Sequence, residues 1–260
     1  MDRPGGDVLG TKAWRWRTCT APQERSVIFT PYGLPEPGPA YLAPTAFIDC
    51  DHRLVRGFVE RAVGAEKLPI GKAIRLFYAV RDQVRYDPFA IRLEPEAFTA
   101  STVLRDGRAF CIPKAVLLAA AARAVDIPSA IGLSDVINHF TSDKLKRAMG
   151  GREVFLHHGY AALHLGGKWV KAAPAFNVEL CKRFGVLPTE FDGVSDAVLQ
   201  EYDAQRNLRM EYLRDHGFWS DLPFNRIKED FEGYYPRSFN EGGTQDEPFG
   251  GSTERLASGA

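Results

Sequence analysis

Apolar residues recur at helical spacing in three stretches of the chain. Residues 51–64 and 71–84 each carry one apolar stripe opposite a charged face, which is typical of helices lying on a core. Asp51 can cap the first helix and Gly64 can end it. The third stretch, 113–125 (PKAVLLAAAARAV), holds ten Ala, Val or Leu residues among thirteen. It predicts a helix buried on almost every side, with Pro113 in its first turn.

Strand signals occupy the segments between and after these helices. Residues 26–30 and 130–134 are short and rich in β-formers. A longer run, 154–165, is followed by Gly166-Gly167 and then by 168–173, which predicts a hairpin that ends at Pro174. The combination indicates an α+β fold in which the buried helix packs against an antiparallel sheet.

Changes in composition divide the chain into four parts. Residues 1–40 are rich in Gly and Pro without a period and predict an arm and an irregular segment. Residues 41–180 hold the helices and strands described above and are expected to form the core. Residues 181–240 are rich in aromatic side chains and predict an ordered extension on that core, whereas 241–260 predict a disordered tail.

Charge and hydropathy exclude several classes of partner. The 260 residues include 33 basic and 33 acidic side chains, so no overall positive field favours nucleic acid or an anionic membrane. No run approaches the roughly 18 apolar residues of a membrane span. The first twenty residues lack an apolar signal core, so a cytoplasmic protein is expected.

The sequence gives no pattern for a cofactor or a metal ion. The four cysteines lie far apart, without a CxxC pair, which argues against a disulfide framework or a zinc site: Cys19, Cys50, Cys111 and Cys181. Neither a phosphate-binding glycine loop nor a dinucleotide fingerprint is present. The acidic stretch with Glu190, Asp192 and Asp196 lacks EF-hand spacing and is expected to be a solvated or substrate-contacting loop. We therefore expect no cofactor.

Cys111 stands where a thiol can become reactive. It follows the turn at residues 106–108 and opens the buried helix. Free N–H groups and the helix dipole favour an anion there, which biases a thiol towards the nucleophilic thiolate. The other interpretation is a small cysteine buried in the core. This stretch by itself leaves both interpretations open.

A nucleophilic cysteine needs a base, and the hairpin holds the best histidines. Strand alternation places His158 and His164 on one face and His157 on the other. Periodicity does not choose between His157 and His158, and either can be a hydrogen-bonded strand histidine. Of the others, His52 and His216 lie in charged, surface-like contexts, and His139 lies in a loop near a site or at the surface.

Three blocks of the sequence, together spanning roughly residues 41–180, resemble the transglutaminase-like superfamily. Val103-Leu104, Gly107, Cys111 and the helix that ends at Pro128 are similar to the family's cysteine block. The hairpin from His158-Gly-Tyr to Trp169-Val-Lys is similar to its histidine block. The run from Val80 to Pro88 resembles the helix and Tyr-Asp-Pro turn that precede the cysteine.

The resemblance implies a papain-like or transglutaminase-like fold and an acyl transfer through a thioester on Cys111. It favours His158 over His157 as the general base, because His158 begins the family phrase. The implied substrates are peptides or proteins, or a small amide or amine. Transfer to water would make the protein a peptidase or amidase, and transfer to an amine a transglutaminase.

One position departs from the family pattern. Ala173 stands where the family usually places an aspartate that orients the histidine. In a regular hairpin residue 158 lies opposite 175, and Asn177 is then the only polar residue at 173, 175 or 177. A Cys-His-Asn set works in papain-like proteases, so Asn177 is the expected third member, unless it is only a turn residue.

Two further expectations concern the chemistry of this site. The backbone N–H of Cys111 is the candidate oxyanion donor. The competing class is a non-catalytic peptide- or protein-binding module of the same fold, in which Ala173 marks a degraded triad.

Overall fold

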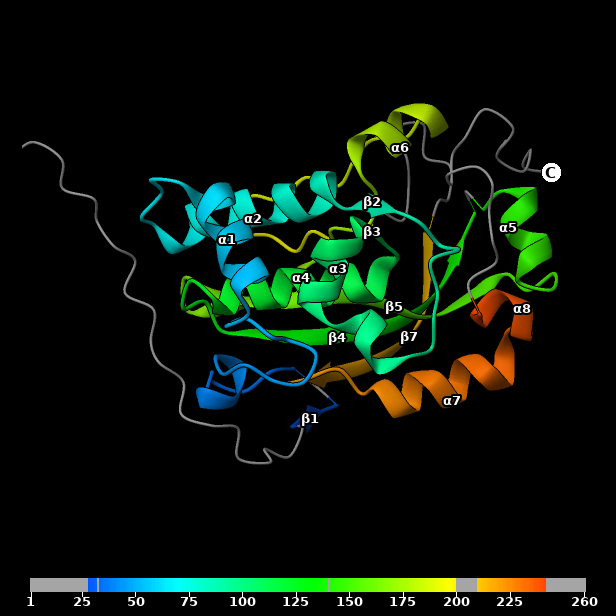
Figure 1. Cartoon of the computed structure of the whole chain (residues 1–260), viewed down its shortest axis with the longest axis horizontal. Coiled ribbons are helices and arrows are strands. Elements are labelled where there is room, and N and C mark those ends of the chain that lie inside the picture. The colour runs from blue at the N-terminus through cyan, green and yellow to red at the C-terminus, as the bar shows by residue number, and fades with distance from the viewer. Residues whose placement is uncertain (1–27, 32, 140, 200–209, 242–260) are drawn as a thin grey trace, which may run out of the picture.

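A five-stranded antiparallel sheet forms the centre of the computed structural model, which describes residues 28–31, 33–139, 141–199 and 210–241. The strand order is β1-β7-β4-β5-β6, and every neighbouring pair is antiparallel (Figure 1). The bounds are β1 (Phe29–Thr30), β4 (Ser129–Asn138), β5 (Val154–Leu165), β6 (Lys168–Ala172) and β7 (Met210–Trp219). A separate parallel pair, β2 (Arg85–Tyr86) and β3 (Arg108–Ala109), lies among the helices.

Four helices gather on one side of the long strands (Figure 1). They are α1 (Arg53–Val63), α2 (Pro69–Gln83), α3 (Ala100–Asp106) and α4 (Cys111–Arg123), of which α4 packs directly on β4 and β5. The remaining elements are η1 (Pro39–Tyr41), η2 (Pro95–Phe98), α5 (Asp143–Ala148), α6 (Val178–Phe184), α7 (Phe224–Tyr234) and α8 (Arg237–Asn240). None of the helices in the described ranges is long and apolar enough to cross a membrane. The predicted α+β architecture is confirmed.

The central helix α4 is buried from Ile112 to Arg123, as the sequence predicts. Its two charged side chains are satisfied by backbone carbonyls. Lys114 Nζ donates to the carbonyls of Arg81 and Val84, at 2.9 and 2.5 Å. Arg123 donates to three carbonyl oxygens, those of Ala43, Ser129 and Ser220. Burial lowers the pKa of Lys114 to about 7, because the surrounding core disfavours its charged form.

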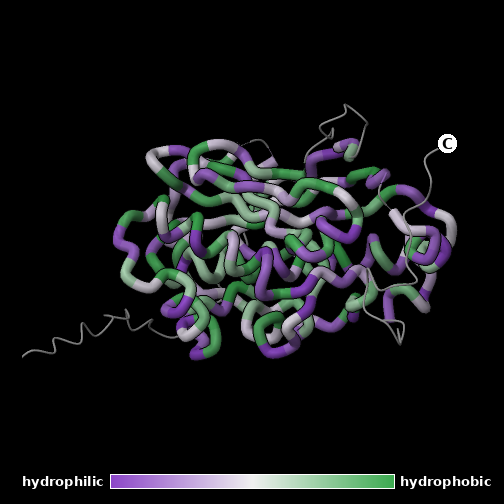
Figure 2. Tube along the Cα trace, turned by 90° about the horizontal axis from the view of Figure 1, so that it is seen from above, coloured by the Kyte–Doolittle hydropathy of each residue, from purple (hydrophilic) through white to green (hydrophobic). Residues whose placement is uncertain are grey.

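The ends of several elements differ from their predicted positions. The helix expected from 51 starts at Arg53, and its cap is His52, whose Nδ1 accepts from Leu54 N at 3.2 Å. The strand expected at 130–134 continues to Asn138, into a segment whose structure the sequence leaves open. Figure 2 shows hydrophobic and hydrophilic stretches interspersed along the tube, with hydrophilic residues at many of the outer turns.

The C-terminal region is part of the sheet rather than an extension lying on a finished core. β7 pairs with β4 over most of its length and with β1 near its end. The aromatic residues that follow it belong to the main core, including Phe224, Phe231 and Tyr235. Most of the predicted arm (1–27) and nearly all of the predicted tail (242–260) lie outside the described residues.

Candidate active site

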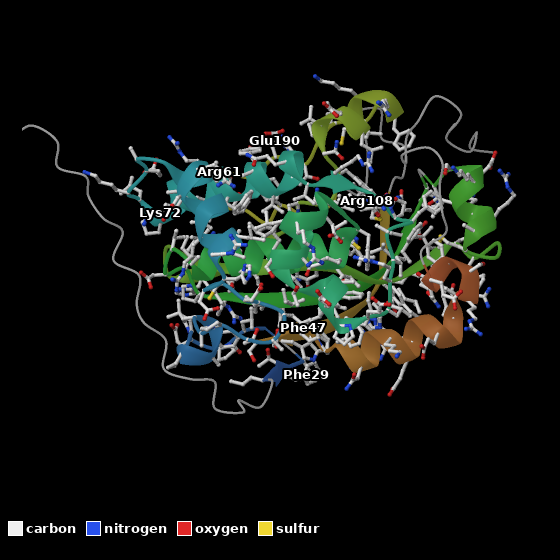
Figure 3. All side chains as sticks on the ribbon, viewed as in Figure 1. Phe29, Phe47, Arg61, Lys72, Arg108 and Glu190 are labelled. Atoms are coloured by element: carbon white, nitrogen blue, oxygen red, sulfur yellow. The ribbon has the colours of Figure 1, made fainter. Side chains whose placement is uncertain are left out.

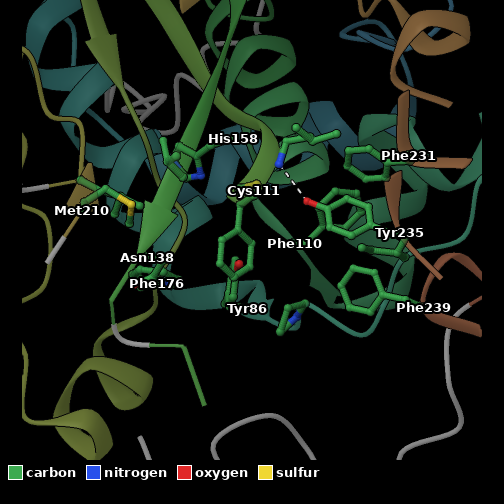
Figure 4. Close-up of a pocket in the computed structure, with 16 residues that line it drawn as sticks. Tyr86, Phe110, Cys111, Asn138, His158, Phe176, Met210, Phe231, Tyr235 and Phe239 are labelled. Atoms are coloured by element: carbon green, nitrogen blue, oxygen red, sulfur yellow. Dashed lines mark hydrogen bonds between the residues drawn. The ribbon is translucent and has the colours of Figure 1, made fainter. Parts of the chain in front are cut away.

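Cys111 is the first residue of α4 and faces an apolar pocket. Phe110 is the N-cap and makes no side-chain capping bond, so the helix N-terminus is left to other partners. Cys111 is partly exposed, and Figure 4 places it between His158 on one side and Phe231 and Tyr235 on the other. The pocket is lined by these four residues and by Tyr86, Pro88, Ile91, Phe110, Val136, Asn138, Phe155, Leu156, Phe176, Leu199, Met210 and Phe239.

Strand β5 approaches the start of α4 through a glycine. A β-carbon at Gly159 would lie 2.7 Å from the Cα of Ile112, closer than real side chains come. The strand backbone therefore packs directly against the first turn of the helix. This approach places the amide N–H of Gly159 beside the thiol, where it and the N–H groups of Ile112 and Cys111 act to lower the thiol pKa. These groups include the predicted donor, the amide of Cys111.

The expectation of a depressed thiol pKa is nevertheless wrong for the free protein. Burial raises the pKa of Cys111 to about 11, against its ordinary value of 9.0. The three amides lower the pKa by less than burial in the apolar pocket raises it. The resting site therefore holds a neutral thiol at pH 7.

His158 lies on β5 and lines the same pocket as Cys111 (Figure 4). It is 5% exposed, and burial lowers the pKa of its imidazole to about 4. Its Nε2 is buried without a hydrogen-bond partner in the described parts of the chain. The structure thus brings the two predicted residues to one cavity, both in their neutral forms.

Asn177 does not make the predicted contact with His158. It is the N-cap of α6, and its Oδ1 accepts a hydrogen bond from the backbone N–H of Tyr86 at 3.1 Å. The regular hairpin assumed for the prediction ends too early, because pairing between β5 and β6 stops at Ala161 and Ala172. Asn177 instead fixes β2, which carries Tyr86 into the pocket wall.

Ala173, at the usual aspartate position, belongs to a second apolar cluster. Its amide donates to the carbonyl of Ala197 at 2.8 Å, so the chain leaves β5 to pair with a later segment. The side chain is 1% exposed and packs with five other buried residues: Tyr41, Ala130, Tyr160, Ala162 and Phe218. An alanine has no polar side-chain atom with which to orient an imidazole.

The sequence does not identify the pocket residues that come from the C-terminal region. Tyr235 accepts a hydrogen bond from Leu156 N at 2.8 Å and donates to Val154 O at 3.3 Å, which fixes the start of β5. Tyr86 also lines the pocket, and burial raises its pKa well above the usual value. The aromatic richness of the region after 200 was the available signal, but it did not show which rings face the thiol.

Several other predicted candidates lie away from the pocket. His139 Nε2 lies 2.6 Å from a carboxylate oxygen of Glu211 on the exposed part of the sheet. Glu190 lies over α2, where it pairs with Arg81 at 3.2 Å (Figure 3). Asp192 accepts hydrogen bonds from two backbone amides, and Asp196 from the amide of Lys171. His216, expected at the surface, is buried.

Part of the chain matches a known protein family. Residues 56–174 match the model of the transglutaminase-like superfamily. This segment is a transglutaminase-like domain. The match contains both Cys111 and His158 and ends just after Ala173. None of the curated proteins compared with the chain matches it.

Two solved structures resemble the chain. One is described as "a putative cysteine protease" from Cytophaga hutchinsonii, with 15% identity and a TM-score of 0.40 over 68% of this chain and 52% of that one. The other is described as "a putative protease" from Parabacteroides distasonis, with 19% identity and a TM-score of 0.32 over 49% of this chain and 25% of that one. The chain thus spans about half and a quarter of their lengths.

Proposed function

We propose that the protein transfers acyl groups from amides through a thioester on Cys111. The observation that carries the proposal is that Cys111 opens a buried helix and shares one pocket with His158, with backbone N–H groups beside the thiol that act to lower its pKa. Such donors stabilise negative charge on sulfur or on the oxygen of a tetrahedral intermediate. A neutral imidazole, that of His158, lines the same cavity.

The two pKa shifts suggest the order of events. The thiol stays protonated until substrate arrives, because burial holds the pKa of Cys111 near 11. As the sulfur attacks the amide carbonyl, His158 takes the thiol proton and then gives it to the departing amine. The thioester that remains is cleaved by water or by a second amine. Unlike a preformed thiolate–imidazolium pair, this site ionises only during the attack.

A second candidate is a non-catalytic module that binds a peptide or protein in the same pocket. It is favoured by Ala173, which leaves His158 Nε2 buried without a partner in the described residues. An imidazole without an orienting group keeps less of its value as a base. Both candidates use the apolar pocket, but only the first needs the sulfur.

Intact-mass spectrometry with a panel of peptide amides and activated esters separates the two candidates. An enzyme gives a Cys111-linked acyl adduct that is absent in Cys111→Ala and forms roughly 10²- to 10⁴-fold more slowly in His158→Gln. Cys181→Ala, which removes another buried thiol, serves as the matched control and should behave as wild type. The binding module would be supported by two results together. No panel member forms an adduct with wild type, and at least one binds Cys111→Ala as tightly as it binds wild type.

Product analysis then distinguishes hydrolysis from transfer. With a substrate that acylates Cys111, putrescine is added at increasing concentration. A peptidase or amidase continues to release the free acid, whereas a transglutaminase forms the putrescine amide in proportion to the amine. The measurement is made by mass on the released product, so the outcome does not depend on the rate of acylation.

A further inference from the structure

Strands β5 and β7 both bulge where they pair with residues 132–136 of β4, the stretch that holds Asp135. On β5, the four residues from Phe155 to His158 face only three residues of β4, from Ser134 to Val136. On β7, the four residues from Asp215 to Phe218 likewise face only three residues of β4, from Gly132 to Ser134. His157 and His216 lie within these bulged segments, and both contact Asp135. Bulges re-aim side chains and are common next to functional sites.

The β5 bulge holds His157 in a conformation that few side chains adopt. His157 has φ +56°, in the left-handed region that favours glycine, and its amide donates to Asp135 Oδ1 at 3.0 Å. The neighbouring bulge on β7 has Gly217 at φ +89°. The two imidazoles that result lie with ring centres 4.5 Å apart.

Nitrogen and oxygen donors converge in this cluster. A ring nitrogen of His157, one of His216 and a carboxylate oxygen of Asp135 all lie within 4.8 Å of one another. His216 Nε2 is 2.8 Å from Asp135 Oδ1, but the contact lacks hydrogen-bond geometry. Both ring nitrogens of His216 are buried without a hydrogen-bond partner among the described residues, and its side chain is 4% exposed.

A second carboxylate fixes the tautomer of His157. Its Nε2 lies 2.6 Å from Asp230 Oδ2 on α7, and a carboxylate only accepts, so Nε2 carries the proton. The lone pair is then on Nδ1, which is buried and unpartnered within the described structure. The side chain of His157 is 1% exposed. Carboxylate–histidine pairs of this kind orient metal ligands in many proteins.

We propose that Asp135, His157 and His216 bind one divalent transition-metal ion of the Zn²⁺ class, with Asp230 positioning His157. Two imidazoles and one carboxylate favour zinc, cobalt or nickel over calcium and magnesium, which prefer oxygen ligands. Ligand atoms bound at about 2.0–2.1 Å lie roughly 3–4 Å apart, so small side-chain rotations complete the site. A water molecule supplies the fourth ligand.

The site stands apart from the proposed acyl transfer. None of its four residues lines the Cys111 pocket. They come from β4, β5, β7 and α7, so a bound ion joins the family-matched segment to the C-terminal strand and helix. Its effect is therefore on the stability of the fold, and its test does not depend on activity.

Isothermal titration of the EDTA-dialysed full chain with Zn²⁺ tests the proposal, with Co²⁺ absorption as the report on coordination. We expect one ion per chain and a Zn²⁺-dependent rise in melting temperature. Asp230→Asn should weaken binding by roughly 10- to 100-fold, the usual effect of losing an orienting group, and His216→Ala by more. His139→Gln is the matched control, since His139, just after β4, also pairs with a carboxylate, that of Glu211 on β7. Its affinity should equal that of wild type.

Two results would overturn the site. The first is that Zn²⁺ does not bind the wild-type protein at concentrations that saturate a control peptide carrying two histidines and one carboxylate. The other is binding that survives in His216→Ala and Asp230→Asn but disappears in Cys111→Ala, which would assign the ion to the thiol. Asp230 is about half-exposed, so its variant keeps the test meaningful even if His216→Ala fails to fold.

Discussion

Gly159 on β5 lies so close to Ile112 on α4 that a β-carbon would meet the helix backbone at 2.7 Å. The approach delivers a strand amide to the sulfur of Cys111. Neither the helix nor the strand could make this arrangement alone. The site is therefore a property of the contact between the two elements.

Gly159→Ala should damage both the fold and the chemistry. The added methyl group must push β5 away from α4, which costs about 1–3 kcal/mol as overpacking and withdraws one N–H from the sulfur. Denaturant unfolding and the rate of adduct formation measure the two effects. Gly233→Ala is the control, because a β-carbon there meets nothing within 4 Å. Equal stability and equal adduct formation in both variants would contradict the contact.

Cys111 should alkylate slowly at neutral pH in the free protein. With the pKa near 11, only about one thiol in a thousand is ionised at pH 8, and the iodoacetamide rate should rise about tenfold per unit of pH up to about 11. Peptide mapping after timed labelling gives the rate at this residue. Ellipticity at each pH shows that the protein remains folded. A rate that levels off by pH 7 would mean a preformed thiolate.

His158 should make the protein less stable in mild acid. Above pH 6.5 the imidazole is neutral in both states, so it adds no pH dependence. Between 6.5 and about 4 the unfolded chain takes up a proton that the folded chain refuses, and stability falls by up to about 3 kcal/mol. Below about pH 4 this contribution stays constant.

The check is urea unfolding from pH 7 to pH 4. The fall in unfolding free energy should be smaller in His158→Gln than in wild type by the amount given above. His164→Gln, on the same strand, is the comparison variant. If the unfolding free energies of His158→Gln and wild type fall equally with pH, protonation of His158 is not the cause of the loss of stability in acid.

Lys114→Met should destabilise the protein although it removes a buried charge. The side-chain nitrogen of Lys114 donates hydrogen bonds to two backbone carbonyls at the end of α2, and methionine leaves both without a donor. Each unsatisfied buried carbonyl costs about 1–3 kcal/mol, against which the gain from removing the charge is partial. Thermal unfolding measures the change, with exposed Lys168→Met as the control. A higher melting temperature for Lys114→Met would show that desolvation of the amine dominates.

The helix with Cys111 and the hairpin with His158 could be predicted because composition and turn residues specify them locally. An uninterrupted run of Ala, Val and Leu has no other place than the core. The Gly166-Gly167 turn sets the hairpin register near the turn itself. Both signals lie within the segments that they describe, and the structure confirms both.

The wrong predictions concern residues whose position or pKa depends on segments far away in the sequence. The position of Asn177 depends on Ala197, which draws the chain away from β5 after Ala172. His216 follows two exposed charged residues, and only a bulge against β4 turns it inward. The pKa of Cys111 depends on pocket walls contributed by Met210, Tyr235 and Phe239. The residues around Asn177, His216 and Cys111 show no sequence pattern that reveals these distant contacts.

The place of β7 between β1 and β4 has a consequence for synthesis on the ribosome. The family-matched segment is complete at residue 174, but the ten-residue strand β4 then still lacks one neighbour. Until residues 210–219 emerge, that strand presents an open row of backbone donors and acceptors, a known template for intermolecular pairing. The nascent chain must therefore be kept apart from its copies, and a fragment ending at 180 should aggregate where the full chain stays monodisperse.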